Sequence, residues 1–385
     1  MQKHGKEQKQ YKLLLSLGTP AFDYICAVDN KFIKRNKLAK ASSNFVSRKS
    51  FDRFLLKLKN QILKKCPGDN TRNVIETIAK LFCVLGNTAT SKNTQTSKQT
   101  NESYVGYAGL IGTDANGKEI EKSVEKYNIA SLLEKSKRKG ARTERVICLI
   151  TPDTERTFIV DKGISEEYCK ELKPSSWKNI FLTSITLLTK SCIAKSAKKL
   201  LRAFIKNRQH IEKNKQHLGS RDILKYRLKQ AHGIVFISLE SPTMLAANRT
   251  NALRLFRKAD VLFANELELK ALGLTEQTLP ILKDHSYVLF LKKDKQGSSV
   301  YLDGNHIANV KPIKIKKPID TTGAGDNFAA GVIYAILTGN DLVRAAQLGN
   351  LLGAICIQHF GAPLPSIPKL KKLLKKYSKQ SPRKT

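Results

Sequence analysis

The residues best suited to chemistry are the nine at positions 320–328, which spell DTTGAGDNF. The small residues Gly323–Gly325 precede an expected helix over Phe328–Leu337, in which apolar residues repeat on one face. A helix N-terminus presents unpaired N–H groups, and glycines let an anion approach them. The Asp326 carboxylate could take a proton from a hydroxyl while these amides hold a transferring phosphate. The stretch predicts phosphoryl transfer onto an alcohol; the alternative is a glycine-rich turn with an ordinary acidic first-turn residue.

The same stretch resembles the second signature of the PfkB (ribokinase-like) family of carbohydrate and nucleoside kinases, DTxGAGDxF, at every fixed position. The resemblance runs from about Leu13 to Pro365. It implies a ribokinase-like fold, which is a three-layer α/β/α arrangement with a central, mostly parallel sheet and a small β lid. It also implies ATP-dependent phosphorylation of a primary hydroxyl, with Asp326 as the base. The anion hole would be formed by backbone N–H groups of Gly323, Ala324, Gly325 and Asp326.

Asp23 is the first candidate on the acceptor side. It lies just past the end of an expected strand, Lys12–Leu17, where open α/β sheets bind their ligands. A carboxylate there can accept hydrogen bonds from two vicinal hydroxyls, although a turn-forming Asp is the plainer alternative. The segment Gly18–Leu38 resembles the opening of adenosine-kinase-like members of the family. That resemblance places Asp23 on the Asp that grips sugar hydroxyls.

A turn at Pro67–Asn73 supplies further acceptor-side candidates. It resembles the family's first signature, a Gly-Gly turn followed a few residues later by Asn. Gly68 and Asn73 match this signature, whereas Asp69 occupies the position of the second Gly. Asp tolerates a positive φ better than most residues, so the backbone can still turn. Asp69 would act either as a further hydroxyl acceptor or as a group that excludes the usual ligand.

Asn265 and Glu268 follow an expected strand and lie three residues apart, on one face of a helix. An amide and a carboxylate so placed can order water around Mg²⁺, which keeps several waters when it is bound between protein and phosphates. The alternative is an N-cap followed by an acidic first turn. The pair resembles the family's N-x-x-E motif, which implies that both residues hold Mg²⁺ through water.

The segment expected to bind the nucleotide departs from the family pattern. Members often have T-x-G-x-x-G after the strand that here ends near Leu291, and only Gly297 fits. Lys292 and Asp294 replace the Thr and the first Gly. Lysines at this position would hold phosphate by charge, or the change would weaken ATP binding.

The resemblance also assigns Thr322 and Asn350 to ATP binding, together with Gly297 and Lys292. A helical Asn is commonly just exposed, which is the alternative for Asn350. Arg142 and Arg156 flank the expected lid strands, either as clamps for phosphate or as solvated surface residues.

The elements that must position these residues alternate along the chain. Strands are expected at residues 12–17, 104–111, 145–150, 180–183, 233–239, 259–264, 287–291 and 298–302. Expected helices include residues 52–65, 73–85, 116–126 and 206–229, and a β-rich run over 310–319 leads into the motif. This alternation is typical of a layered α/β fold with a mainly parallel sheet.

One main kinase domain is expected over residues 13–365, because no linker divides the chain. Segments at about 24–48 and 142–162 would form the lid, and the polar stretch 88–103 would be a surface insertion. Residues 1–12 are a basic tail. The basic tail 366–385 interleaves lysines with leucines, which is typical of an amphipathic helix that packs on the body or touches an acidic partner.

The composition favours a globular protein. Of 385 residues, 41% are hydrophobic, which allows a sizeable core. The seven cysteines form no CxxC pair and indicate a reducing compartment. We find no secretory signal and no apolar stretch that could span a membrane. A cytoplasmic location without a membrane partner is therefore expected.

The formal net charge of +37 raises the question of an anionic partner such as nucleic acid. The lysines run along the whole chain instead of forming one stripe, and no RNP-like or zinc-finger motif is present. This distribution favours solvated surface charge.

A ribonucleoside is the first expected acceptor, because the opening segment resembles adenosine kinases, and a free sugar such as ribose or fructose is the second. The rival of another class is a catalytically degenerate kinase fold that acts as a basic nucleic-acid-binding or scaffold protein. Asp69, Lys292 and Asp294 favour this rival slightly, and the intact DTTGAGD opposes it.

Overall fold

The computed structural model describes residues 12–86, 103–153, 155–212, 218–279 and 286–378. The expected polar insertion 88–103 and the basic tail 1–12 therefore lie almost entirely outside the described residues. All seven cysteines are described, and none forms a disulfide. Within the described ranges, no helix combines the length and the hydrophobicity that a membrane crossing requires.

A nine-stranded sheet runs through the centre of the protein, in the order β14-β13-β12-β11-β10-β9-β1-β5-β6. Neighbouring strands from β12 to β6 are parallel, and β13 and β14 continue the sheet antiparallel. The strands are β1 (Lys12–Leu17), β5 (Val105–Ile111), β6 (Ala130–Lys135), β9 (Trp177–Thr183), β10 (Val235–Ser238), β11 (Val261–Asn265), β12 (Val288–Lys292), β13 (Ser298–Leu302) and β14 (Asn305–Val310).

Helices cover both faces of this sheet, because strand residues alternate between two apolar cores. Leu14 and Phe236 belong to the first core, and Leu15 and Ile237 belong to the second. The helices on the first core are α3 (Asn70–Leu85), α4 (Ala115–Lys126), α7 (Ser220–Gln230), α11 (Ala324–Leu337), α12 (Leu342–Cys356) and α13 (Ile367–Ser378). Those on the second are α5 (Ser184–Leu188), α6 (Cys192–Ile211), α8 (Pro242–Ala247), α9 (Arg249–Phe256) and α10 (Glu266–Ala271). The predicted three-layer α/β/α arrangement is confirmed.

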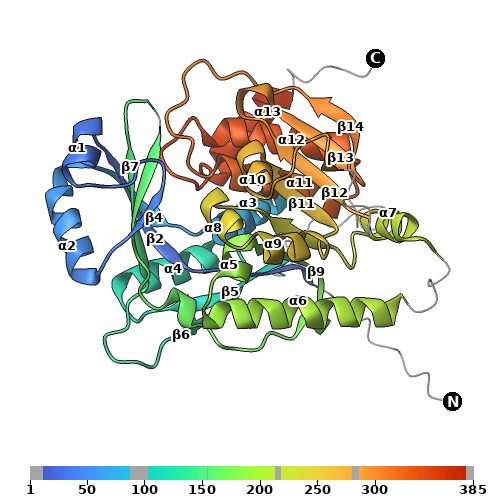
Figure 1. Cartoon of the computed structure of the whole chain (residues 1–385), viewed down its shortest axis with the longest axis horizontal. Helices are drawn as coiled ribbons and strands as arrows, with labels where there is room; N and C mark the ends of the chain where they lie inside the picture. Colours follow the sequence, from blue (N-terminus) through green and yellow to red (C-terminus); the bar gives the residue numbers. More distant parts are fainter. Residues whose placement is uncertain (1–11, 87–102, 154, 213–217, 280–285, 379–385) are drawn as a thin grey trace.

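A smaller five-stranded sheet lies at one end of the protein (Figure 1), in the order β3-β8-β7-β2-β4. Its strands are β2 (Ala21–Ala27), β3 (Ser43–Phe45), β4 (Ile62–Pro67), β7 (Glu144–Ile150) and β8 (Arg156–Asp161). The helices α1 (Asn30–Arg35) and α2 (Arg48–Lys57) pack on it through Ile33 and Phe51. Only Gly18–Pro20 separate β1 from β2, so the two sheets meet beside the carboxyl end of β1.

The predicted helix over residues 52–65 is wrong in its second half. The helix α2 ends at Lys57, and Ile62–Pro67 form strand β4, which pairs antiparallel with β2. Ile62, Lys64 and Cys66 are more buried than Leu63 and Lys65 between them, which is the two-residue period of a strand. The apolar spacing that predicted a single helix extends over two elements. The second element is a strand because it pairs with β2.

The β-rich run predicted over residues 310–319 is also wrong. Strand β14 ends at Val310, and no strand follows it before α11. The predicted helix over 206–229 is divided, because α6 ends at Ile211 and α7 begins at Ser220. The tail helix is present as α13, whose Leu370, Leu374 and Tyr377 belong to the first core.

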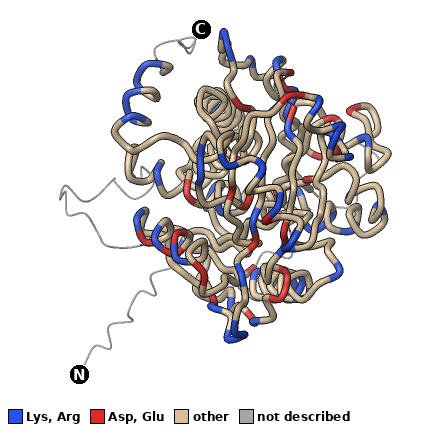
Figure 2. The backbone as a smooth tube through the Cα atoms, turned by 90° about the vertical axis from the view of Figure 1, so that its left-hand side faces the viewer, with Lys and Arg blue, Asp and Glu red and all other residues tan. Residues whose placement is uncertain are grey.

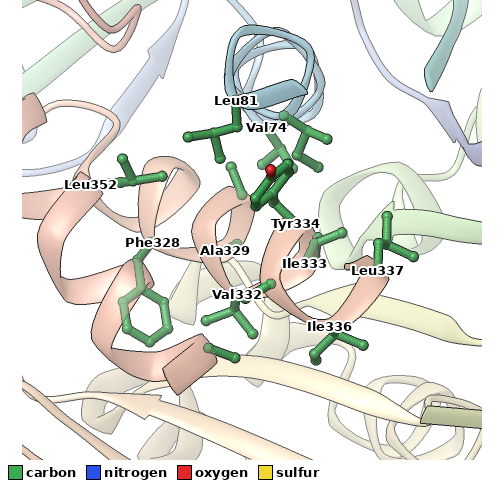
Figure 3. Close-up of a cluster of buried hydrophobic side chains, with 14 of the residues drawn as sticks. Val74, Leu81, Phe328, Ala329, Val332, Ile333, Tyr334, Ile336, Leu337 and Leu352 are labelled. Atoms are coloured by element: carbon green, nitrogen blue, oxygen red, sulfur yellow. The ribbon is translucent and has the colours of Figure 1, made fainter. Parts of the chain in front are cut away.

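The helix that carries the DTTGAGD stretch is enclosed by other elements. Figure 3 shows apolar side chains of α11 and α3, including Tyr334 and Leu81, packed together. The helix begins at Ala324, four residues earlier than predicted, so Asp326 lies in its first turn. Gly323 precedes it with φ 75°, and a Cβ at this position would lie 2.2 Å from Cβ of Ala362. Both constraints require glycine there.

A buried charge network ties α3 to its surroundings. Glu76 pairs with Arg72 and with Lys80, whose Nζ lies 2.7 Å from Glu76 Oε1, and all three side chains are at most 5% exposed. Arg72 also donates to the carbonyl oxygen of Pro67, and Lys80 donates to that of Leu364. Burial opposes ionisation of Glu76, yet the two cations outweigh it and lower its pKa.

We expect Glu76→Gln to destabilise the fold by about 3–5 kcal/mol, because it leaves two buried cations without their shared counter-ion. The free energy of unfolding in urea, measured at pH 7, tests this expectation. The matched control is Glu119→Gln, since Glu119 pairs with Lys122 on an exposed helix face and should cost no more than about 1 kcal/mol. Equal stability of the two variants would contradict the expectation.

Candidate active site

Most of the predicted site residues lie at the carboxyl edge of the parallel strands, near the N-terminal ends of α3, α10 and α11. Asn73 in the first turn of α3 donates from Nδ2 to Asp326 Oδ2 over 2.9 Å, which joins α3 to α11. The Asp326 charge also acts on the carboxyl groups of Glu268 on α10 and of Asp23 on β2. Residues from both sheets therefore share one polar site.

Asp326 has the properties of a base. Its pKa is raised to about 6 by burial, against the hydrogen bond from Asn73 and the positive charges of Lys292 and Arg156. At neutral pH the carboxyl group is then mostly ionised and yet binds a proton more readily than an exposed carboxylate. Asp326 lies beside the N-terminal amides of an α-helix, which favour an anion.

Asn73 and Thr71 offer unsatisfied polar atoms to this site. Both side chains are buried, and neither Asn73 Oδ1 nor Thr71 Oγ1 has a hydrogen-bond partner among the described residues. Buried polar atoms are rarely left without a partner. These two atoms are therefore free to bond to water or to a polar group of a ligand at the start of α3.

Asp23 lies in β2 and not on the turn where it was predicted. Its carboxylate faces Gly68 so closely that a Cβ on Gly68 would lie 2.2 Å from Oδ1. The pKa of Asp23 is raised to about 7, first by burial and then by Asp69 and Asp326, while Arg72 opposes the shift. Gly68 thus has a steric reason to be glycine, and the Asp23 carboxyl group lies beside it at the site.

Asp69 takes up the positive φ that its position requires, with φ 84° and ψ 126°. It caps α3, because Oδ2 accepts from the Arg72 backbone N–H over 3.1 Å and from the Tyr107 hydroxyl over 2.7 Å. Burial raises its pKa to about 7 despite these hydrogen bonds. A non-glycine residue in this conformation is strained by roughly 1–3 kcal/mol, and the two hydrogen bonds offset part of that cost.

Asn265 and Glu268 form a reciprocal capping box at the start of α10. Asn265 Oδ1 accepts from the Glu268 backbone N–H over 2.8 Å, and Glu268 Oε2 accepts from the Asn265 backbone N–H over 2.7 Å. Glu268 is 5% exposed, and burial raises its pKa although Lys292 opposes the shift. The capping role that the sequence offered as the alternative is thus present, and any role toward Mg²⁺ is additional to it.

Lys292 ends β12 and lies against the start of α11. Its Nζ would be 3.3 Å from a Cβ on Gly325 and is 3.9 Å from Glu268 Oε2. Thr322 donates from its backbone N–H and from Oγ1 to Asp320 Oδ1, which fixes the turn before α11. Arg156 of β8 donates to the carbonyl oxygen of Thr321 over 3.1 Å. Two cations therefore lie beside the helix N-terminus.

Gly297 and Asn350 both lie close to Val310, at the end of β14, and away from the cluster around Asp326. Asn350 Nδ2 donates to the carbonyl oxygens of Val310 and Lys311, and Gly297 has φ 94° where a Cβ would lie 2.2 Å from the Val310 oxygen. Both residues hold the segment after β14. Arg142 approaches Asp52 at 3.9 Å with a side chain 36% exposed, which fits the surface alternative.

The sequence analysis missed Glu240, Arg72 and Tyr107. Glu240 lies two residues after the end of β10 and is 9% exposed, and its charge interacts with Asp326, Glu268 and Lys292. A carboxyl group just past a buried strand is the signal that identified Asp23, and it would have found Glu240 too. Tyr107 carried no such signal, because its hydrogen bond to Asp69 joins β5 to the start of α3, and nothing in the sequence shows that the Arg72 side chain is buried.

Residues 92–370 match the model of the pfkB family carbohydrate kinases. Because the match covers more than half of the chain, the protein belongs to this family. The resemblance of the DTTGAGD stretch to the family signature is thereby confirmed, and phosphotransfer is the chemistry of the family.

Similar proteins carry both nucleoside-kinase and sugar-kinase names. Adenosine kinase from Saccharomyces cerevisiae is 24% identical over 359 residues, which are 92% of this chain and 97% of the yeast protein. An uncharacterized sugar kinase from Archaeoglobus fulgidus is 46% identical over 59 residues, which are 15% of this chain and 23% of the archaeal protein. Adenosine kinase from Sinorhizobium meliloti matches with TM-score 0.69 at 21% identity over 95% of this chain and 99% of that one. The fold is the ribokinase-like α/β fold.

We expect Asp23→Asn to stabilise the ligand-free protein at pH 8 by about 1–3 kcal/mol, after allowance for solvent screening of a half-buried group. The raised pKa means that the folded chain binds a proton more tightly than the unfolded chain, so the free energy of unfolding falls as pH rises toward about 7 and Asp23 ionises in its buried position. The gain should shrink as pH falls toward 5. Urea unfolding at several pH values measures it, with Asp222→Asn on exposed α7 as the control that should change little. A variant less stable than the parent at pH 8 would contradict the expectation.

Proposed function

We propose that this protein is an ATP-dependent kinase that phosphorylates the primary hydroxyl of a ribonucleoside. The observation that carries the proposal is Asp326, a carboxylate of raised pKa in the first turn of α11 that is hydrogen-bonded to Asn73. A carboxylate in this position could accept a proton while the helix N-terminus holds the transferring phosphate, which supports the proposal.

Asp326 would accept the hydroxyl proton as the acceptor oxygen attacks phosphorus. The backbone N–H groups of Gly323–Asp326 would stabilise charge on the phosphoryl group, with Lys292 beside them. Thr322, Gly297 and Asn350 would contribute to ATP binding, the latter two by holding the segment after β14. Mg²⁺ would neutralise the phosphate charge, with Asn265 and Glu268 holding it through water.

The acceptor would be held by Asp23, Gly68, Asp69 and Asn73. Asp23 and Asp69 are carboxyl groups that could accept hydrogen bonds from hydroxyls, and Asn73 Oδ1 has no partner among the described residues, which suits an acceptor with several hydroxyls. The lengthwise similarity to yeast adenosine kinase supports a ribonucleoside. A free sugar is the second candidate, supported by the local similarity to the archaeal sugar kinase and by Asp69 in place of glycine.

The small sheet would act as the lid over this site, since it supplies Asp23 and Arg156. Its closure would exclude water, so that ATP is not hydrolysed. The cytoplasm is the expected location for a reaction that uses ATP.

We expect Asp326→Asn to lower turnover at least about 100-fold, since a general base contributes roughly 10²–10⁴ in rate. ADP release is measured with ATP, Mg²⁺ and a panel of nucleosides and sugars, and Asp222→Asn serves as a control that should keep full activity. Turnover that survives in Asp326→Asn would refute Asp326 as the base.

A folded parent with no turnover and no ATP binding, but with nucleic-acid affinity that falls steeply with salt, would favour the basic scaffold. Figure 2 shows Lys and Arg distributed over many elements with Asp and Glu among them, which does not favour that rival.

The pH dependence offers a separate test of Asp326. Because the reaction needs the ionised carboxylate, kcat/KM should fall on the acid side as pH drops through about 6. The positive charge of Lys292 lowers this pKa, so Lys292→Met should move the acid limb to higher pH besides reducing the rate. The measurement is kcat/KM for the preferred acceptor between pH 5 and pH 8. An acid limb that Lys292→Met leaves in place would mean that another group titrates.

A further inference from the structure

The start of α6, the long helix along the lower edge of Figure 1, packs against the connection that leads from β8 of the small sheet to β9 of the large sheet. The buried hydroxyl of Ser196 on α6 donates to the Tyr168 carbonyl oxygen of this connection over 3.3 Å. Thr189, which lies between α5 and α6, donates to Glu166 Oε1 over 3.3 Å. Contacts on both sides of Cys192 in the sequence therefore hold the connection against the first turns of α6.

This packing brings Cys169 close to Cys192. Cys192 and Ser196 are about one helical turn apart, on the same face of α6. Helix side chains lean toward the helix N-terminus, so the atom that Ser196 contacts lies over the turn that begins at Cys192. That atom is the carbonyl oxygen of the peptide group that joins Tyr168 to Cys169. The backbone of Cys169 therefore lies beside the first turn of α6.

The two thiol groups are neighbours as well. The Cys192 thiol is a hydrogen-bond neighbour of the Cys169 thiol, and this contact is the largest cause that raises the pKa of Cys169, while the positive charge of Lys195 opposes the shift. Cys169 Sγ also donates to the Glu167 carbonyl oxygen over 3.1 Å. Cys169 is exposed and Cys192 is half-buried, so a small molecule in solution can reach the pair.

We propose that Cys169 and Cys192 are a redox site, at which a low-molecular-weight disulfide converts the two free thiols into a reversible intramolecular disulfide bond. The bond would fasten the connection between the two sheets to α6, and it would close a loop that contains β9 and α5. Disulfides in reducing compartments are typically transient and redox-sensing, which suits an exposed pair. The proposal is independent of the proposed kinase function.

The chemistry is two successive thiol–disulfide exchanges. The Cys169 thiolate attacks one sulfur of the external disulfide, and one thiolate of that molecule leaves. The Cys192 thiolate then attacks the Cys169 sulfur, which releases the second thiolate. The two protein thiols thereby lose two protons and two electrons, and the external disulfide takes up the electrons and becomes two thiols.

The test is peptide mapping of the purified full chain after incubation with oxidised glutathione at pH 8. The remaining thiols are alkylated, and the digest is analysed by mass spectrometry without reduction. We expect a pair of peptides joined through Cys169 and Cys192, which dithiothreitol should separate. Cys192→Ser should stop the reaction at a mixed disulfide between Cys169 and glutathione. Cys83→Ser is the matched control, because Cys83 is also exposed and should not affect the bond.

Two results of the mapping would overturn the proposal. One is a mixed disulfide on Cys169 that persists in the parent without the joined pair, and the other is a Cys169 that glutathione leaves unmodified.

Urea unfolding of the oxidised and the reduced parent supplies a second readout. The bond restricts the unfolded chain, so the oxidised parent should unfold at a higher urea concentration, and Cys192→Ser should lose this difference. A lower midpoint after oxidation would contradict the proposal, because the bond would then require a distorted fold.

Discussion

The hydrogen bond between Asn73 and Asp326 is the interaction on which the site depends. It joins residues 253 positions apart and fixes the first turns of α3 and α11 against each other. The two helices then pack along their length in the first core, so apolar burial holds the polar pair in place. Most of the stabilisation comes from the core, because a single hydrogen bond contributes only about 1 kcal/mol. The hydrogen bond fixes the orientation of the Asp326 carboxyl group.

This arrangement brings several carboxyl groups into buried positions that disfavour their ionised form. Asp23, Asp69 and Asp326 all have raised pKa values, with burial as the largest cause. Such groups destabilise the ligand-free fold at neutral pH. The buried Arg72–Glu76–Lys80 network lies on the same helix and fixes α3 behind them. Functional sites commonly store strain of this kind, and the surrounding structure must stabilise it.

The sequence predicts those features that depend on local pattern or on a contiguous motif. Strands β1 and β13 have the predicted bounds, because both are short, largely buried runs with clear ends. Strand β4 was missed, because its residues become a strand only by pairing with β2. Asp23, Asn73 and Asp326 were found by motif and do come together. Tyr107 was not found, because its hydrogen bond to Asp69 joins distant elements. Glu240 was not found although its place just past a buried strand was a usable signal.

The surface and the site have opposite charge, and the difference bears on how a nucleotide would bind. The chain carries a formal net charge of +37, which attracts polyanions over long distances at low salt. At the site, however, Asp326, Glu240 and Glu268 are close enough to act on one another, with Lys292 as the nearby cation. A bare triphosphate would be repelled by these carboxylates, whereas a triphosphate that carries a divalent cation would be attracted to them.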